Sequence, residues 1–75
     1  MTDSEKMKEL IALALGVSSH CDGCIAHHAQ ALAKLQASRE EVVEALGVAI
    51  AMGGGPSVMY AQDALKAFDE FQKSS

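Results

Sequence analysis

Apolar residues recur three to four positions apart in four segments of this sequence, a spacing typical of amphipathic helices. The first segment runs from Ser4 to Ser18 and the second from Asp22 to about Leu35. The third follows Ser38, and the fourth continues to about Gln72. No stretch alternates polar and apolar residues as a strand would, and no linker is long enough to separate domains. We therefore predict an all-α fold of four helices in an up-down arrangement, as a single domain over residues 1–75.

The breaks between the segments carry signals for helix ends. Ser38, followed three residues later by Glu41, forms a capping box that marks the start of the third helix. Gly53-Gly54-Gly55-Pro56 ends that helix and starts the fourth, because glycine tolerates the helix-ending conformation and proline fits a first helical turn. We expect one apolar face of each helix to form the core. These faces comprise Met7, Leu10, Ile11, Ala14 and Val17, then Cys24, His28, Ala31, Leu32 and Leu35, then Val42, Val43, Leu46, Ala49 and Ile50, and finally Val58, Ala61, Leu65 and Phe68.

The length and charge of the chain limit its partners. A chain of 75 residues is short for a core that is stable alone, since it buries only about 60% of the surface its unfolded state exposes. We therefore expect a homo-oligomer. The net charge of −4 argues against the basic surface of a nucleic-acid-binding protein. Neither a signal peptide nor an apolar run long enough for a bilayer is present, so we expect a cytoplasmic protein with no membrane partner.

The residues that carry chemistry gather in Cys21-Asp22-Gly23-Cys24-Ile25-Ala26-His27-His28, at the start of the second predicted helix. In the cytoplasm a C-x-x-C pair is more often catalytic or metal-binding than structural. The N-terminus of a helix favours the thiolate, which is the form of cysteine that attacks. One cysteine can attack a hydroperoxide or a partner's disulfide, and the other can then close an intramolecular disulfide. Exposure favours Cys21 as the attacking residue, whereas the helix dipole and His28 favour Cys24, so the order stays open.

His28 and Glu9 are the candidate proton carriers of this site. At about 100° per residue, Cys21, Cys24 and His28 fall within roughly 60° of one another around the helix. His27 points about 100° away from His28, toward the surface or an interface. If the first two helices form an antiparallel hairpin, Glu9 and His28 both lie about 10 to 15 Å from the turn and can meet side by side. A carboxylate that orients the imidazole would make it a better base, and the alternative is that Glu9 points to solvent.

Two other interpretations of the cysteine pair stay open. The cysteines can be small buried hydrophobic residues of a helical core. They can also bind zinc together with His20, His27 or His28, in a non-enzymatic metal-binding or assembly module. No second C-x-x-C pair is present in the sequence, so a closed zinc site would need a neighbouring subunit. We therefore predict a redox site without a metal or a cofactor, and we expect Tyr60 and Phe71 in the core or in a subunit contact.

Glu9, the pattern Cys21-x-x-Cys24-x-x-x-His28, the Ser-capped third helix and the Gly-rich turn together resemble the carboxymuconolactone decarboxylase/AhpD superfamily. Within this superfamily, the motif is similar to the core of AhpD-type alkylhydroperoxidases, in which an upstream glutamate joins the thiols and the histidine in a proton relay. The resemblance implies an AhpD-like helical bundle that assembles into trimers or hexamers. It also implies that Cys21, Cys24, His28 and Glu9 are the catalytic residues.

The same resemblance implies a role in peroxide defence. The substrate would be a hydroperoxide or a partner peroxiredoxin, and a thiol or dithiol electron donor would restore the site. Carboxymuconolactone-decarboxylase-like activity is the alternative, although decarboxylases of the superfamily generally lack the cysteine pair. The chain departs from its relatives in three respects. First, some relatives have a histidine between the two cysteines, and His20, which precedes the pair, cannot take the role of that histidine. Second, many relatives have a glycine at the position of Gln36. Third, larger relatives carry extra N-terminal helices.

Overall fold

The computed structural model describes residues 4–53 and 55–74, which form four α-helices and, within these ranges, no strand. The helices are α1 (Ser4–Ser18), α2 (Asp22–Lys34), α3 (Arg39–Gly53) and α4 (Gly55–Ser74). The predicted all-α fold is therefore confirmed. The limits of α1 agree with the prediction, α2 ends one residue earlier, and α4 extends past Gln72. Gly54, in the middle of the predicted glycine turn, lies outside the described residues.

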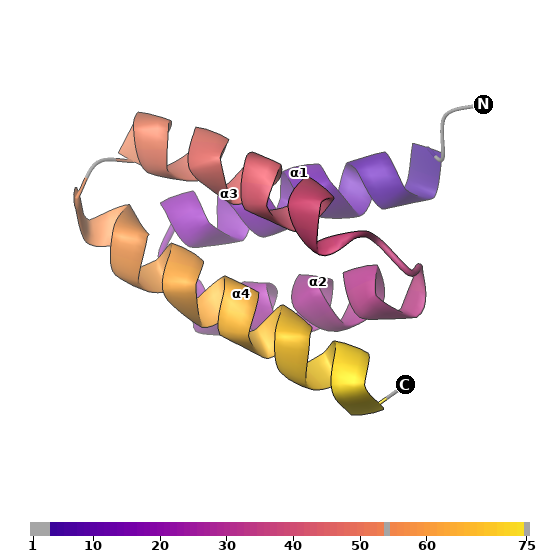
Figure 1. Ribbon diagram of the computed structural model, residues 1–75. Helices are drawn as coiled ribbons and strands as arrows, with labels where there is room; N and C mark the ends of the chain where they lie inside the picture. Colours follow the sequence, from indigo (N-terminus) through magenta and orange to yellow (C-terminus); the bar gives the residue numbers. More distant parts are fainter. Residues whose placement is uncertain (1–3, 54, 75) are drawn as a thin grey trace.

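Successive helices run in opposite directions, but α2 and α3 do not pack on each other (Figure 1). Instead, α1 packs on α2 and α3, and α4 packs on α2, α3 and, less extensively, α1. The short connection from α2 to α3 thus joins helices on a diagonal of the bundle. As a result, the end of α1, the start of α2, the end of α3 and the start of α4 all lie at one end of the molecule (Figure 1). This end carries the cysteine pair.

The turn between α2 and α3 combines a helix-ending motif with the predicted capping box. The N–H groups of Gln36 and Ala37 donate to the carbonyl oxygens of Ala33 and Leu32 at 3.1 and 3.0 Å, which is the pattern of a Schellman motif. Gln36 has a φ of 60°, so a glutamine occupies the left-handed position where glycine is usual. Ser38 Oγ then accepts a hydrogen bond from the N–H of Glu41 at 3.0 Å, and Ser38 N–H donates to Glu41 Oε1 at 2.8 Å. The predicted capping box is confirmed.

The core lies between the four helices, and Phe68 is its largest fully buried side chain. Several residues that the periodicity predicted for the core are instead exposed, because the sequence has more apolar positions than one small bundle can bury. Met7, Ile11, Val43 and Val58 are the clearest of these errors, with exposed fractions between 38% and 53%. The buried hydrophobic residues are Leu13, Val17, Ile25, Ala29, Leu32, Ala33, Ala37, Val42, Leu46, Ala49, Ala61, Ala64 and Phe68.

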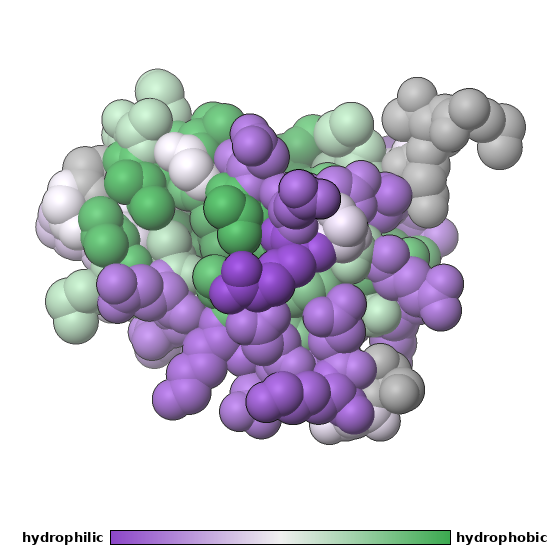
Figure 2. Space-filling view, viewed as in Figure 1, coloured by the Kyte–Doolittle hydropathy of each residue, from purple (hydrophilic) through white to green (hydrophobic). Residues whose placement is uncertain are grey.

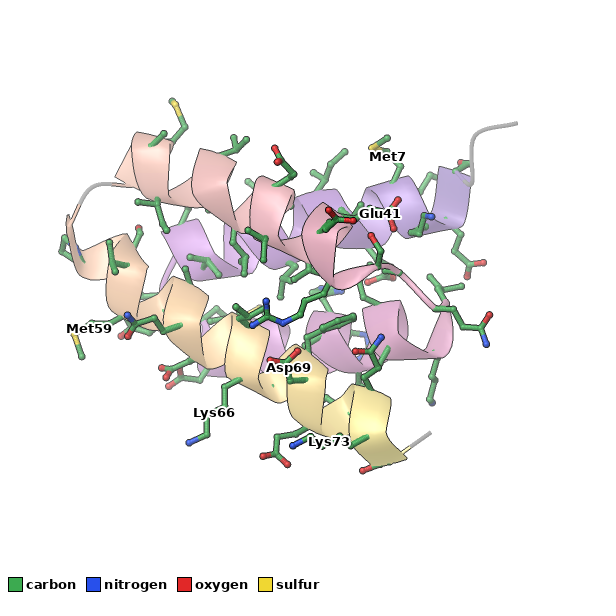
Figure 3. The ribbon with its side chains drawn as sticks, viewed as in Figure 1. Met7, Glu41, Met59, Lys66, Asp69 and Lys73 are labelled. Carbon is green, nitrogen blue, oxygen red and sulfur yellow. A yellow bond between two sulfur atoms is a disulfide. The ribbon has the colours of Figure 1, made fainter. Side chains whose placement is uncertain are left out.

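Exposed apolar side chains gather on α1 and α3. Met7, Ile11 and Leu15 of α1 and Val48 of α3 line an open groove of about 600 Å³. Figure 3 labels Met7 and Glu41, which mark one end of this groove. Figure 2 shows hydrophobic residues gathered where the second half of α3 meets the start of α4, and residues 45–62 contain no Asp, Glu, Lys or Arg. An apolar surface of this kind is typical of a contact with another molecule. None of the described helices is both long enough and apolar enough to cross a membrane.

Candidate redox site

The turn that joins α1 to α2 is fixed by backbone hydrogen bonds and by a ring contact. The N–H of Cys21 donates to the carbonyl of Gly16 at 2.9 Å, and the N–H of His20 donates to that of Val17 at 3.1 Å. His20 has a φ of 55°, a left-handed conformation that costs a residue other than glycine about 1 kcal/mol. Its ring stacks on Tyr60 of α4, with ring centroids 4.4 Å apart and planes at 1°. Such a stack contributes about 0.5 to 1.5 kcal/mol, which is comparable with the backbone cost.

Cys21 is the N-cap residue of α2, and Cys24 lies in its first turn. Cys21 has an extended backbone with φ −104° and ψ 99°, and its Sγ accepts a hydrogen bond from the N–H of Cys24 at 3.2 Å. A disulfide joins the two cysteines, whose Cα atoms are 5.3 Å apart. Both residues are half-buried. The sulfur of Cys21 therefore takes the place of the oxygen of an ordinary N-cap, at the positive end of the α2 dipole.

Gly16 allows α1 to approach the cysteine pair closely. A Cβ atom at Gly16 would lie 3.2 Å from Cβ of Cys24 and 3.5 Å from the backbone nitrogen of Ile25. Gly16 is buried, and its carbonyl accepts the hydrogen bond that fixes Cys21. Sequence reasoning missed this role. The signal that could have found it is an isolated glycine within a helical pattern, which often marks close packing.

Glu9 and His28 meet across the antiparallel pair of α1 and α2. Glu9 Oε1 lies 2.6 Å from Nδ1 of His28, and the two side chains are 24% and 25% exposed. The juxtaposition expected from the hairpin is therefore present. Because Nδ1 faces the carboxylate, Nε2 is the ring nitrogen that can exchange a proton with another group. His28 also lies one helical turn after Cys24, but the catalytic roles of Cys21, Cys24, His28 and Glu9 stay predictions.

The other two histidines do not complete a metal site. His27 is exposed and meets His28 edge to face, with ring centroids 4.9 Å apart. His20 is exposed and contacts Tyr60, a partner that sequence reasoning did not identify. Within residues 4–53 and 55–74, no cluster of three or more His, Cys, Asp or Glu side chains is suited to hold a metal ion. The site thus contains a Cys21–Cys24 disulfide and, one helical turn after Cys24, an imidazole that contacts Glu9. These groups are suited to thiol–disulfide chemistry.

Three comparisons find similar proteins. The sequence model described as "Carboxymuconolactone decarboxylase family" matches residues 4–67. An uncharacterised protein of Cupriavidus necator is 48% identical over 63 residues, which cover 84% of this chain and 56% of that protein. The protein described as uncharacterised protein 4 in the cox locus of Paracoccus denitrificans is 33% identical over 66 residues, covering 88% of this chain and 60% of that protein.

A solved structure is also similar. It is the crystal structure of apo-lpg0406, a carboxymuconolactone decarboxylase family protein from Legionella pneumophila. The two chains are 63% identical and superimpose with a TM-score of 0.88, over 89% of this chain and 60% of that one. This chain thus spans a little over half the length of these similar proteins.

Proposed function

Because this chain belongs to the carboxymuconolactone decarboxylase family and carries a C-x-x-C pair at a helix N-terminus, we propose that it is an AhpD-like, thiol-dependent oxidoreductase of antioxidant defence. Its substrate is a hydroperoxide, or the disulfide of a partner peroxiredoxin. The observation that carries the proposal is the contact of Glu9 with His28 at 2.6 Å, one helical turn after Cys24. A cysteine pair with an oriented imidazole one helical turn further along the same helix favours redox chemistry over the decarboxylation for which the family is named.

With a hydroperoxide, the thiolate of one cysteine attacks the terminal oxygen and the O–O bond breaks. The alkoxide leaves as an alcohol, with the proton that His28 took from the thiol. The thiol of the other cysteine then attacks the sulfenic acid, so that the disulfide forms and water leaves. Two electrons pass from the dithiol to the peroxide. A thiol or dithiol electron donor restores the dithiol by exchange.

With a peroxiredoxin partner, the same two cysteines work by disulfide exchange. One thiolate attacks a sulfur of the partner's disulfide and forms a mixed disulfide. The other cysteine attacks that bond, which releases the partner in its reduced form and leaves the Cys21–Cys24 disulfide. Both routes need a pool of reducing thiols, so the proposal includes a cytoplasmic location.

Free-thiol titration tests the dithiol chemistry. A small excess of an organic hydroperoxide should remove both thiols of the reduced protein together, and dithiothreitol should restore both. Cys21→Ser should abolish this reversible disulfide. If the wild type keeps both thiols free under peroxide and binds one equivalent of zinc instead, the redox proposal is wrong.

Glu9→Gln tests the proton relay separately. The glutamine keeps the size of the side chain but not the charge that orients His28, so peroxide-dependent thiol loss should slow by at least about tenfold. Glu5→Gln is the matched control, since Glu5 is an exposed glutamate one turn earlier on α1. Equal rates for the two variants, with both proteins folded, would remove Glu9 from the relay.

We also propose that further copies of this chain cover the groove between α1 and α3, in a trimer or a hexamer. The support is the exposure of Met7, Ile11, Leu15 and Val48, whose exposed fractions are 49% to 63%. Light scattering should give a mass of several chains for the wild type and a lower one for Ile11→Glu. Gln30→Glu, an exposed change on α2, is the control. A single-chain mass for the wild type would contradict this assembly.

A further inference from the structure

We propose that His20 and Tyr60 are a positioning pair for the cysteines, and that their stacked rings set how readily the disulfide forms. This inference depends on the dithiol chemistry proposed above. It concerns a turn residue and an α4 residue that do not themselves react.

The stack ties an exposed turn to the core of the protein. His20 is exposed and has the left-handed φ of 55°, so neither burial nor its intrinsic backbone preference holds it in place. Tyr60 is half-buried and packs against the buried residues of the core. The parallel contact between the two rings, at 4.4 Å between centroids, is the link between this turn and α4.

The backbone conformation of His20 determines where Cys21 lies. Cys21 is the next residue, and its N–H donates to Gly16 while its Sγ accepts from the N–H of Cys24. The two Cα atoms lie 5.3 Å apart in the disulfide, and we infer that these contacts favour the same separation in the reduced pair. Without the stack, His20 leaves the left-handed conformation more often, because that conformation is unfavourable for a histidine. The reduced cysteines then spend less time in the disulfide geometry, and the equilibrium shifts toward the dithiol.

Tyr60→Leu tests the pair by removing one ring. The measured quantity is the ratio of disulfide to dithiol in glutathione buffers of known composition, which gives the reduction potential of the Cys21–Cys24 couple. The equilibrium constant for disulfide formation should fall by about three- to tenfold, the range expected for one lost aromatic contact. That change is a rise of about 15 to 30 mV in reduction potential. Tyr60→Phe keeps the ring and should retain the wild-type potential.

His20→Ala tests the other ring, because His20 is exposed and alanine keeps the unfavourable left-handed backbone but has no ring to stack on Tyr60. It should raise the potential in the same direction as Tyr60→Leu. The double variant should rise no further than the larger single effect, since the two residues act through one contact.

Phe71→Leu is the control for a general loss of stability. Phe71 is a second half-buried ring of α4 that packs against the core, about 16 Å further along the helix from Tyr60. It should lower the melting temperature and leave the potential unchanged. An unchanged potential in both Tyr60→Leu and His20→Ala would overturn this inference and leave the proposed function standing. An equal shift in Phe71→Leu would do the same. A wild type that forms no reversible disulfide would overturn the proposed function and this inference with it.

Discussion

The turn between α1 and α2 and the turn between α2 and α3 share one backbone pattern but cap the next helix with different side chains. In both turns a residue with a left-handed φ, His20 at 55° or Gln36 at 60°, ends the helix in a Schellman motif. The second turn then begins α3 with the pair Ser38 and Glu41, which exchange two hydrogen bonds. The first turn begins α2 with two cysteines at the same spacing.

The difference shows that C-x-x-C here occupies the positions of a capping box. Cys21 stands where Ser38 stands, and its sulfur accepts the hydrogen bond of the third helical residue, as the serine oxygen does. Cys24 stands where Glu41 stands. A motif that elsewhere only starts a helix here places two sulfur atoms together, and His28, which contacts Glu9, lies one helical turn after the second of them.

Moving the cysteine pair to the second turn tests whether the capping geometry alone makes the thiols reactive. Ser38→Cys with Glu41→Cys, in a chain that also carries Cys21→Ser and Cys24→Ser, should form a disulfide under a strong oxidant because the backbone geometry is similar. Its reaction with an organic hydroperoxide should be at least about a hundredfold slower than that of the wild type, since the residue one helical turn after the transplanted second cysteine is Ala45 and not a histidine. Stopped-flow measurement of thiol loss checks this. A wild-type rate in the transplanted pair would mean that the capping geometry alone provides the reactivity.

Gly16→Ala tests the close packing that distinguishes the first turn. Gly16 and Leu32 hold the same position in the two Schellman motifs, but the glycine leaves room for Cys24 at 3.2 Å from an added Cβ. Overpacking costs about 1 to 3 kcal/mol, and alanine recovers about 1 kcal/mol of helix propensity. We expect a net loss of up to about 2 kcal/mol in the free energy of unfolding by urea. Gly47→Ala is the control, because a Cβ there meets nothing within 4 Å. An equal response of the two variants would contradict the packing argument.

Ser38→Ala removes the cap from the second turn without touching the sulfur atoms. Loss of the N-cap oxygen should lower the free energy of unfolding by about 1 kcal/mol. Ser38→Asp keeps a capping oxygen and should stay close to the wild type. Thiol reaction rates should be unchanged in both variants. A slower thiol reaction in Ser38→Ala would mean that the two turns are coupled through the bundle.

Gln36→Gly and His20→Gly should change the free energy of unfolding by different amounts, although both replace a residue with a left-handed φ. Glycine removes the cost of the left-handed backbone at either position, but it also raises the conformational entropy of the unfolded chain, which opposes folding. The net effect of Gln36→Gly should be a stabilisation of up to about 1 kcal/mol. His20→Gly also loses the stack on Tyr60, so its net effect on stability should be near zero. Urea unfolding of the reduced proteins checks both. Equal stabilisation by the two substitutions would mean that the stack contributes nothing.

Much of this fold could be predicted from the sequence, since helix limits and caps are local features. The box of Ser38 and Glu41 and the limits of α1 agree with the prediction for that reason. Periodicity could not decide which apolar residues face the core, since Met7 and Val43 have the spacing of buried positions and yet are exposed. The choice depends on how four helices pack together, and the surplus apolar residues are free to contact other chains.

In the candidate site, too, contacts between neighbouring elements could be predicted from the sequence, whereas contacts between distant segments could not. The meeting of Glu9 with His28 followed from helix rise and an antiparallel hairpin, which are rules about neighbouring elements. The contact of His20 with Tyr60 joins a residue of the turn between α1 and α2 to a residue of α4 that lies forty positions later. No local pattern signals such a contact. Gly16 carried a signal in its glycine, but its meaning depended on the position of Cys24 in space.

The weakest expected effect concerns Glu41, which holds in the second turn the position that Cys24 holds in the first. The hydrogen bond from the backbone N–H of Ser38, and then the contact with Lys6 at 3.0 Å, lower the pKa of Glu41 below its ordinary value. A carboxyl with a lowered pKa adds stability above its unfolded pKa of about 4.3, and this stability is lost as the pH falls through the folded value. Glu41→Gln should therefore be slightly less stable than the wild type at pH 7 and should match it at pH 2. Glu40→Gln, its exposed neighbour, controls for a lost charge near the helix N-terminus. A constant difference at both pH values would mean that the charge of Glu41 is not the source of this stability, because glutamine has nearly the same size as glutamate.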